Sequence, residues 1–252
     1  MKRATGATFA GLALFLFSML GIVLANNFVM MFIFWELVGV SSYILIGHYY
    51  GRASAADACK QAFIVNRIGD FGFMLGILML WFATGSVVFG EIFAKVAACS
   101  SRQSLYLTIA CILVFCGTIG KSAQLPLHVW LPNSMEGPTP GLFTAPCGDD
   151  GRGGCVHAGA RLSASRRGAG CPGRRLPGLA RSLAWSPALM ATQQNDIKRI
   201  LAYSTISQLG YMVLGSGRRP GSGRADVSPL YARLLQMPAL PVRGVSDRRA
   251  AP

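Results

Sequence analysis

Long apolar runs separated by short polar stretches fill the first half of the chain. At about 1.5 Å of rise per residue, a helix needs roughly 20 apolar residues to cross the hydrocarbon core of a bilayer. Runs of this length predict an all-α, polytopic bundle of transmembrane helices. We place the spans at 8–25, 28–46, 63–83, 105–124 and, with a weaker apolar pattern, 198–214, and we expect a polar loop over 48–60.

Prolines and charged side chains follow directly after the fourth apolar run. Pro126 and Pro132 each remove a backbone hydrogen-bond donor and clash with the preceding turn, which opposes an uninterrupted helix. Broken helices at membrane depth occur where they line a protein cavity or a water-filled one, and ion transporters place their sites at such breaks. The sequence therefore predicts a short broken helix at 126–135 that folds back toward the bundle.

Composition divides the chain into two kinds of sequence. Hydrophobic residues make up 52% of the chain and charged residues 13%, against roughly 25% charged residues in a typical soluble domain. Residues 1–140 hold 8 Lys and Arg against 5 Asp and Glu, whereas residues 141–252 hold 16 against 5. The segments 141–186 and 216–252 are rich in Arg, Gly and Pro, which predicts disorder.

Four charged residues stand out within the apolar part. Glu36 lies near the middle of the second run, where a charge costs about 2.5–3.5 kcal/mol on insertion scales. We interpret it as part of a proton path; the alternative is a pair with a cation on a neighbouring helix. Lys121 is either a buried amine that exchanges protons or a lysine that reaches the membrane surface. Arg67 and Asp70, three residues apart, can neutralise each other on one helical face.

His128 and the cysteines are less specific signals. His128 lies between prolines and near Trp130, so a packing histidine and a proton relay are both open. The seven cysteines have no spacing typical of zinc sites. No metal site is predicted.

Four motifs in one order carry a resemblance to a known family. They are FIFWELVGVSSYILIGHYY, KQAFIVNRIGDFGF, GKSAQLPLHVWLPNSMEGPTP and ALMATQQNDIKRILAYSTISQLGYMVLG. Over residues 1–140 and roughly 187–215 the chain resembles the antiporter-like chain 5 (bacterial L-type) membrane subunits of the proton-pumping NADH:quinone oxidoreductase, respiratory Complex I. Related cation/proton antiporter subunits share parts of these motifs.

The resemblance implies roles for several residues. Glu36 matches the buried glutamate of the family's proton channel, and Lys121 matches the lysine beside its discontinuous helix. The two are expected to change charge state together. Further matches to polar motif positions are Arg67, Asp70, Asp196 and Lys198.

The resemblance also implies the molecular setting. The redox chemistry of the family belongs to other subunits, so NADH, FMN, iron–sulfur clusters and quinone are expected in partners, and no cofactor in this chain. The implied partners are the other membrane and peripheral subunits of Complex I and the lipid bilayer, without nucleic acid. The implied location is the bacterial inner (plasma) membrane, which the chain crosses several times.

Other functions remain open at this point. One is a subunit of a multisubunit Na⁺/H⁺ antiporter, and another is a non-functional fragment. A third is a membrane-anchored protein whose basic segments bind nucleic acid or anionic lipid. Those segments lack the interleaved aromatic residues that stack on bases.

The basic segments depart from the family pattern, which also has several helices before the position of Met1. With permitted codons read one nucleotide later, residues 141–161 can become VSSLLHAATMVAAGVYMLAR and residues 228–244 can become HLYTHAFFKCLLFLCGG, both similar to family helices. We hypothesise frameshifts just after Pro140, near Pro187 and after about Leu214. The family's channel histidine would then lie under Pro146, and the chain as written would lack a continuous half-channel. Resequencing the gene tests this hypothesis; an intact frame encoding GDDGRGGCV would refute it.

Overall fold

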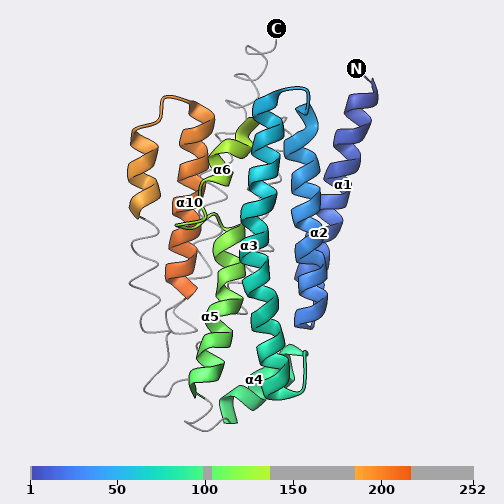
Figure 1. Ribbon diagram of the computed structural model, residues 1–252, viewed down its shortest axis with the longest axis vertical. Helices are drawn as coiled ribbons and strands as arrows, with labels where there is room; N and C mark the ends of the chain where they lie inside the picture. The colour runs from blue at the N-terminus through green and yellow to red at the C-terminus, as the bar shows by residue number, and fades with distance from the viewer. Residues whose placement is uncertain (1, 99–103, 137–184, 217–252) are drawn as a thin grey trace.

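The computed structural model describes residues 2–98, 104–136 and 185–216, and these residues are helical or connect helices, with no strand among them. α1, α2, α3 and α5 run along the long axis of the molecule, and α10 lies beside α6 (Figure 1). The predicted all-α architecture is confirmed. The elements are α1 (Lys2–Leu24), α2 (Phe28–Ile46), η1 (Gly47–Tyr49), α3 (Ala53–Thr84), α4 (Phe89–Ala98), α5 (Ser104–Lys121), α6 (Trp130–Asn133), η3 (Ser134–Glu136) and α10 (Ile197–Ser216). A further helix covers 185–192.

Three of the described helices are long and apolar enough to cross a membrane: Gly6–Leu24, Phe28–Tyr49 and Ala53–Thr84. The helix from Leu105 to Lys121 is apolar but shorter. α2 has the bounds that the apolar pattern predicts, and α1 and α10 cover the predicted spans 8–25 and 198–214 to within a few residues.

The predicted loop at 48–60 is wrong from Ala53 onward, because α3 begins there. The segment ASAADACKQA is rich in alanine, which has the highest helix propensity. Its charged side chains remain exposed on the helix surface, where Lys60 and Asp57 approach to 4.0 Å at three-residue spacing. Polar residues therefore lengthen α3 beyond its apolar part instead of ending it.

Glycines bring α3 and α5 into backbone contact. A Cβ atom added at Gly76 would lie 2.7 Å from the Val114 nitrogen and 2.9 Å from the Ala110 carbonyl oxygen. A Cβ added at Gly69 would lie 3.0 Å from the Gly120 Cα atom. The two helices can approach this closely only because side chains are absent, and the contact places Asp70 of α3 beside Lys121 of α5.

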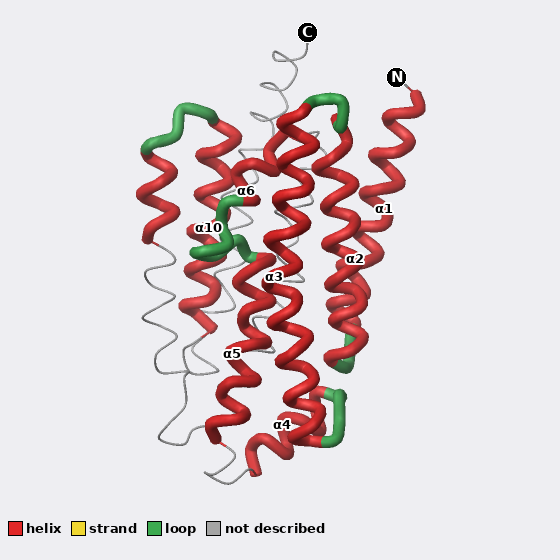
Figure 2. Tube along the Cα trace, in the orientation of Figure 1, coloured by secondary structure: helices red, strands yellow, loops and turns green. Residues whose placement is uncertain are grey.

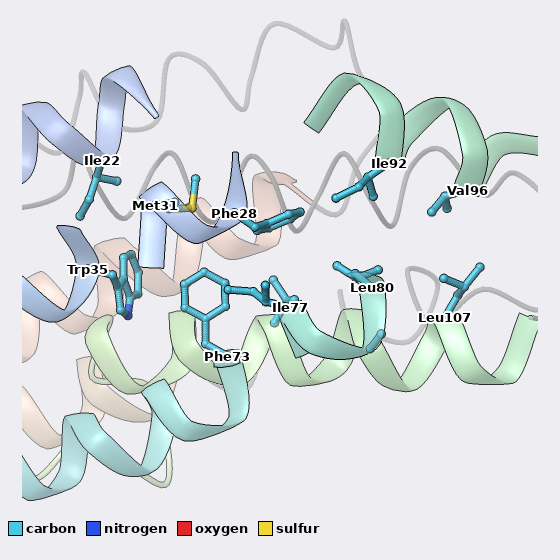
Figure 3. Packing of buried hydrophobic residues seen from close by; sticks show 12 residues of the cluster. Ile22, Phe28, Met31, Trp35, Phe73, Ile77, Leu80, Ile92, Val96 and Leu107 are labelled. Carbon is cyan, nitrogen blue, oxygen red and sulfur yellow. The ribbon is translucent and has the colours of Figure 1, made fainter. Parts of the chain in front are cut away.

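The main apolar core lies between α2, α3, α4 and α5, with Ile22 added from α1. Trp35 of α2 meets Phe73 of α3 edge to face, with ring centroids 5.5 Å apart, and Figure 3 shows the two rings side by side. A second cluster joins Trp130 of α6 and Ile206 of α10 to Ala62 of α3. The second cluster fixes the segment after α5 against the rest of the bundle.

The chain leaves the helical path at Lys121, three residues before the predicted end of the fourth span. Residues 122–129 form turns (Figure 2), and Ala123 takes the left-handed conformation with φ of 49°. The break thus begins before Pro126. Pro132 does not interrupt a helix, because it lies in the first turn of α6, where a backbone N–H has no intrahelical partner.

The segment after the break is held by polar contacts. The Trp130 indole N–H donates to the Gly120 carbonyl at 3.1 Å, and the Gln124 amide donates to the Ile206 carbonyl of α10 at 3.3 Å. The Asn133 amide donates to the Gln61 side-chain oxygen of α3 at 2.8 Å. These bonds tie the segment after the break to α5, α10 and α3, so the break has a defined structure.

A first prediction concerns the glycine contact between α3 and α5. The Gly76→Ala variant should be destabilised by about 2–3 kcal/mol, because the new methyl group would overlap backbone atoms of α5. Gly90→Ala in α4 is the matched control, since nothing lies within 4 Å of its Cβ position and alanine favours a helix by about 0.5–1 kcal/mol. Thermal unfolding in detergent measures both variants. Equal unfolding temperatures for the two would contradict the backbone contact.

Candidate functional site

Four charged side chains from three helices form one connected set, which we call the charge chain: Glu36 of α2, Arg67 and Asp70 of α3, and Lys121 at the end of α5. The Arg67 guanidinium forms an ion pair with the Glu36 carboxylate, and its Nη1 atom lies 3.8 Å from Asp70 Oδ2. Lys121 Nζ lies 3.7 Å from the same Asp70 oxygen. Two acids and two bases therefore alternate, with a formal sum of zero.

The charge chain is buried at one end and partly exposed at the other. The side chains of Asp70 and Lys121 are 2% and 7% exposed, whereas those of Glu36 and Arg67 are 29% and 28% exposed. The Arg67 guanidinium also lies over the Phe63 ring, 4.5 Å from its centroid. A buried charge is tolerated when it is paired. The pairing across three helices thus explains how four charges persist in an apolar bundle.

The structure shows the partners of Glu36 and Lys121, and the proton-carrying role of each stays a prediction. The pairing of Glu36 with a cation on a neighbouring helix is found, and the partner is Arg67. Lys121 is buried beside Asp70, which does not fit the alternative of a lysine that reaches the membrane surface. Arg67 and Asp70 lie close enough to interact, as their three-residue spacing predicts, but each also contacts a residue of another helix.

Two residues of α2 that the sequence did not single out complete the site. The Trp35 indole N–H donates to Asp70 Oδ1 at 2.6 Å. A Cβ atom at Gly39 would lie 2.7 Å from Arg67 Nη2 and 2.8 Å from Lys121 Nζ. Trp35 and Gly39 are four residues apart and share a helical face beside Glu36. That spacing is the sequence signal that could have pointed to them.

The other predicted site residues lie apart from the charge chain. His128 is half-buried in the turns after α5, and its Nδ1 atom is buried without a hydrogen bond to any described residue. Asp196 is exposed and pairs with Arg199 at 3.6 Å, next to the start of α10. Lys198 is half-buried in the first turn of α10. No ion pair joins Asp196 to the charge chain among the described residues.

The arrangement can transmit a change of charge from one helix to the next. Two opposite charges about 4 Å apart interact by roughly 4 kcal/mol at an effective dielectric constant of 20. Asp70 Oδ2 is shared by two cations, so loss of the charge on Lys121 leaves Arg67 as its remaining cationic contact in the charge chain. Arg67 can then move from Glu36 toward Asp70. The contacts thus connect Glu36 to Lys121 through Arg67 and Asp70.

Comparison with known proteins agrees with this fold. The family described as NADH:quinone oxidoreductase/Mrp antiporter, TM, matches residues 25–144 and 186–225, which include the whole charge chain. The chain belongs to this family. The resemblance inferred from the four motifs is thereby confirmed, and so is the assignment to a membrane protein class.

Relatives within this family are similar over most of the chain. NAD(P)H-quinone oxidoreductase chain 5 of Synechocystis sp. is 48% identical over 221 residues, covering 83% of this chain and 31% of that protein. The chloroplastic subunit 5 of Glycine max is 43% identical over 233 residues, covering 86% and 29%. The chain thus spans less than a third of the length of these relatives.

Solved structures show the same helical arrangement. The Mrp complex from Dietzia sp. DQ12-45-1b matches with a TM-score of 0.85 at 25% identity, over 98% of this chain and 27% of that one. The membrane-bound sulfane sulfur reductase, an archaeal respiratory complex, matches with a TM-score of 0.73 at 21% identity, over 87% and 45%. The second match shows a shared fold alone.

The family match leaves residues 145–185 unmatched. These residues lie entirely within the segment 141–186, for which we hypothesise a shifted reading frame. The second match extends to residue 225, past the expected start of the second such segment at 216. The basic segments lie outside the described residues, and the frameshift hypothesis stays a prediction.

Proposed function

We propose that the chain is part of a membrane subunit that translocates protons, driven by electron transfer from NADH to quinone in other subunits. The single observation that carries the proposal is the charge chain, in which Glu36, Arg67, Asp70 and Lys121 alternate in sign across α2, α3 and α5. Buried ionisable groups in membrane helices mark ion pathways. The relatives named quinone oxidoreductase chain 5 support the coupling to NADH oxidation.

The proposed mechanism uses the shared oxygen of Asp70. When Lys121 releases a proton from Nζ, Asp70 keeps Arg67 as its cationic contact in the charge chain, and the guanidinium shifts toward it. The Glu36 carboxylate loses its partner and takes up a proton. Reprotonation of Lys121 draws Asp70 back, Arg67 returns to Glu36, and Glu36 releases its proton. One proton leaves and one enters in each half of the cycle, so the formal charge of the set stays at zero.

The setting of the subunit follows from the same proposal. NADH, FMN, iron–sulfur clusters and quinone bind to partner subunits, and this chain carries no redox group. Its partners are the other membrane and peripheral subunits of Complex I. The membrane is the bacterial inner membrane, although several relatives are chloroplastic. Within the described part of the chain, no group of three or more His, Cys, Asp or Glu side chains could hold a metal ion.

A second candidate is a subunit of a multisubunit Na⁺/H⁺ antiporter. The observation that favours it is the match to the Mrp complex with a TM-score of 0.85. The two candidates differ in what drives proton movement. NADH oxidation drives it in the first, and a sodium gradient drives it in the second.

Inverted membrane vesicles from the source organism separate these functions. Proton uptake after addition of NADH, and proton release after a sodium pulse, are followed with a pH-sensitive dye in vesicles from cells with the gene deleted or restored. We expect NADH-driven uptake that disappears on deletion and returns with the restored gene. Proton release from the vesicles that follows a sodium pulse alone would assign the chain to an antiporter, because Na⁺ enters as H⁺ leaves. Proton movement of both kinds that is unaffected by deletion would contradict both functions.

The frameshift hypothesis has its own test within this experiment. The coding DNA around residues 135–220 is sequenced, and the deletion strain receives either the chain as written or the frame-corrected gene. We expect the corrected gene alone to restore uptake. Full restoration by the 252-residue chain as written would refute the frameshifts.

A further inference from the structure

The Trp35 side chain contacts both members of the buried ion pair. Its indole N–H donates to Asp70 Oδ1 at 2.6 Å, and its ring centroid lies 5.9 Å from Lys121 Nζ. Trp35 is 2% exposed, so both contacts are shielded from solvent. A buried tryptophan usually finds a partner for its N–H group, but a carboxylate that already faces two cations is an unusual one.

Rigid neighbours hold the indole in this position. The Phe73 ring of α3 packs against it edge to face, within the core drawn in Figure 3. Four residues along the same face of α2, Gly39 leaves open the space that the heads of Arg67 and Lys121 approach. This face of α2 therefore orients the Asp70 carboxylate at Trp35. One turn later, at Gly39, it leaves room for the cationic groups of Arg67 and Lys121.

We propose that Trp35 is a positioning residue, which fixes the Asp70 carboxylate so that Oδ2 stays turned toward Arg67 and Lys121. Oδ1 is held by the indole, whereas Oδ2 lies 3.8 Å and 3.7 Å from the two cationic nitrogens. Loss of the indole N–H allows the carboxylate to rotate about its Cβ–Cγ bond. Either carboxylate oxygen of Asp70 can then pair with either cation. The movement of Arg67 between Glu36 and Asp70 then no longer follows the protonation state of Lys121. This role rests on the proposed proton translocation.

The hydrogen bond itself is tested without any pumping. The 252-residue chain, with ¹⁵N-labelled tryptophan, is placed in lipid nanodiscs, and the indole N–H resonances are recorded. The Trp35→Phe variant identifies the Trp35 resonance. In Asp70→Asn, which weakens the acceptor by removing its charge, we expect that resonance to move more than those of Trp81, Trp130 and Trp185. An unmoved Trp35 resonance would overturn the contact and the proposal with it.

The positioning role is tested by proton uptake per assembled complex. Trp35→Phe keeps a ring of similar shape and removes only the N–H donor, and we expect uptake to fall about tenfold, the effect of losing one hydrogen bond to a charged group. Trp81→Phe is the matched control, because Trp81 is 48% exposed and is not part of the main core cluster. It should pump at the wild-type rate.

A double variant separates this role from a merely structural one. In the Asp70→Asn background, adding Trp35→Phe should lower uptake less than twofold further, because the charged acceptor is already gone. A structural tryptophan would instead reduce the amount of assembled complex and leave its specific rate unchanged, which would overturn the proposal. A frame-corrected subunit that does not pump overturns the proposed function, whereas a pumping frame-corrected subunit with an unaffected Trp35→Phe variant overturns the positioning role alone.

Discussion

Replacing Glu36 by glutamine is expected to lower NADH-driven proton uptake at least tenfold while the complex assembles at its normal level. Glutamine keeps the size of the side chain and an oxygen that can accept from Arg67, but it cannot take up a proton as an acid. General acid–base groups contribute about 10²–10⁴-fold to the rates they assist, so the loss should be large. Dye-monitored uptake in vesicles, normalised to the amount of assembled complex, measures the effect.

Asp57→Asn is the control for the Glu36 variant. Asp57 lies near the start of α3 with its side chain 80% exposed, and its contact with Lys60 is a surface pair of the kind worth little to stability. Removing this acid should leave uptake unchanged. Wild-type uptake by the Glu36→Gln variant would remove Glu36 from the proton path, even if the ion pair to Arg67 has a structural role.

The second large effect is expected at Lys121. Lys121→Arg keeps a positive charge beside Asp70, but a guanidinium does not release its proton in a protein. Uptake should therefore fall at least tenfold with the complex still assembled. A lysine that served only to neutralise Asp70 could be replaced by arginine without this loss. The same vesicle assay, with immunodetection of the assembled complex, separates the two roles.

Two further variants show whether the Lys121→Arg variant fails because it cannot exchange a proton or because arginine is larger. Lys95→Arg in α4 tests the same exchange at a lysine outside the charge chain, where Nζ donates to the Thr84 carbonyl at 2.6 Å, and it should pump normally. Lys121→Met removes the charge without adding bulk near Gly39. If Lys121→Arg fails and Lys121→Met pumps normally, the arginine acts through its size and the proton-carrying role of Lys121 is contradicted.

The transmembrane spans could be predicted from the sequence because each is formed by one continuous run of apolar residues. α2 has its predicted bounds, since an apolar run of 19 residues begins after the Asn27 cap. Hydropathy alone placed the start of α3 too late, because the high helix propensity of alanine extends the helix through polar residues. The fourth span was expected to end at residue 124, but α5 ends at Lys121, and tertiary contacts hold the turns that follow.

The site could be predicted only in part. Glu36 and Lys121 stand out because charges in apolar runs are costly, and Arg67 and Asp70 because they share a helical face. Their connection into one set depends on the register between α3 and α5, which glycines such as Gly69 and Gly76 determine through backbone contacts. A tryptophan in an apolar run looks like core packing, so the role of Trp35 appears only when its partner on another helix is known.

The most direct test of the charge chain is the double variant Glu36→Gln/Arg67→Gln. It removes one acid and one base together, so Asp70 and Lys121 remain as a neutral pair and no unpaired charge is left in the bundle. Proton uptake and the amount of assembled complex are measured in the same vesicles. Normal assembly with uptake below a tenth of the wild-type rate is predicted; normal assembly with wild-type uptake would show that these charges only neutralise each other.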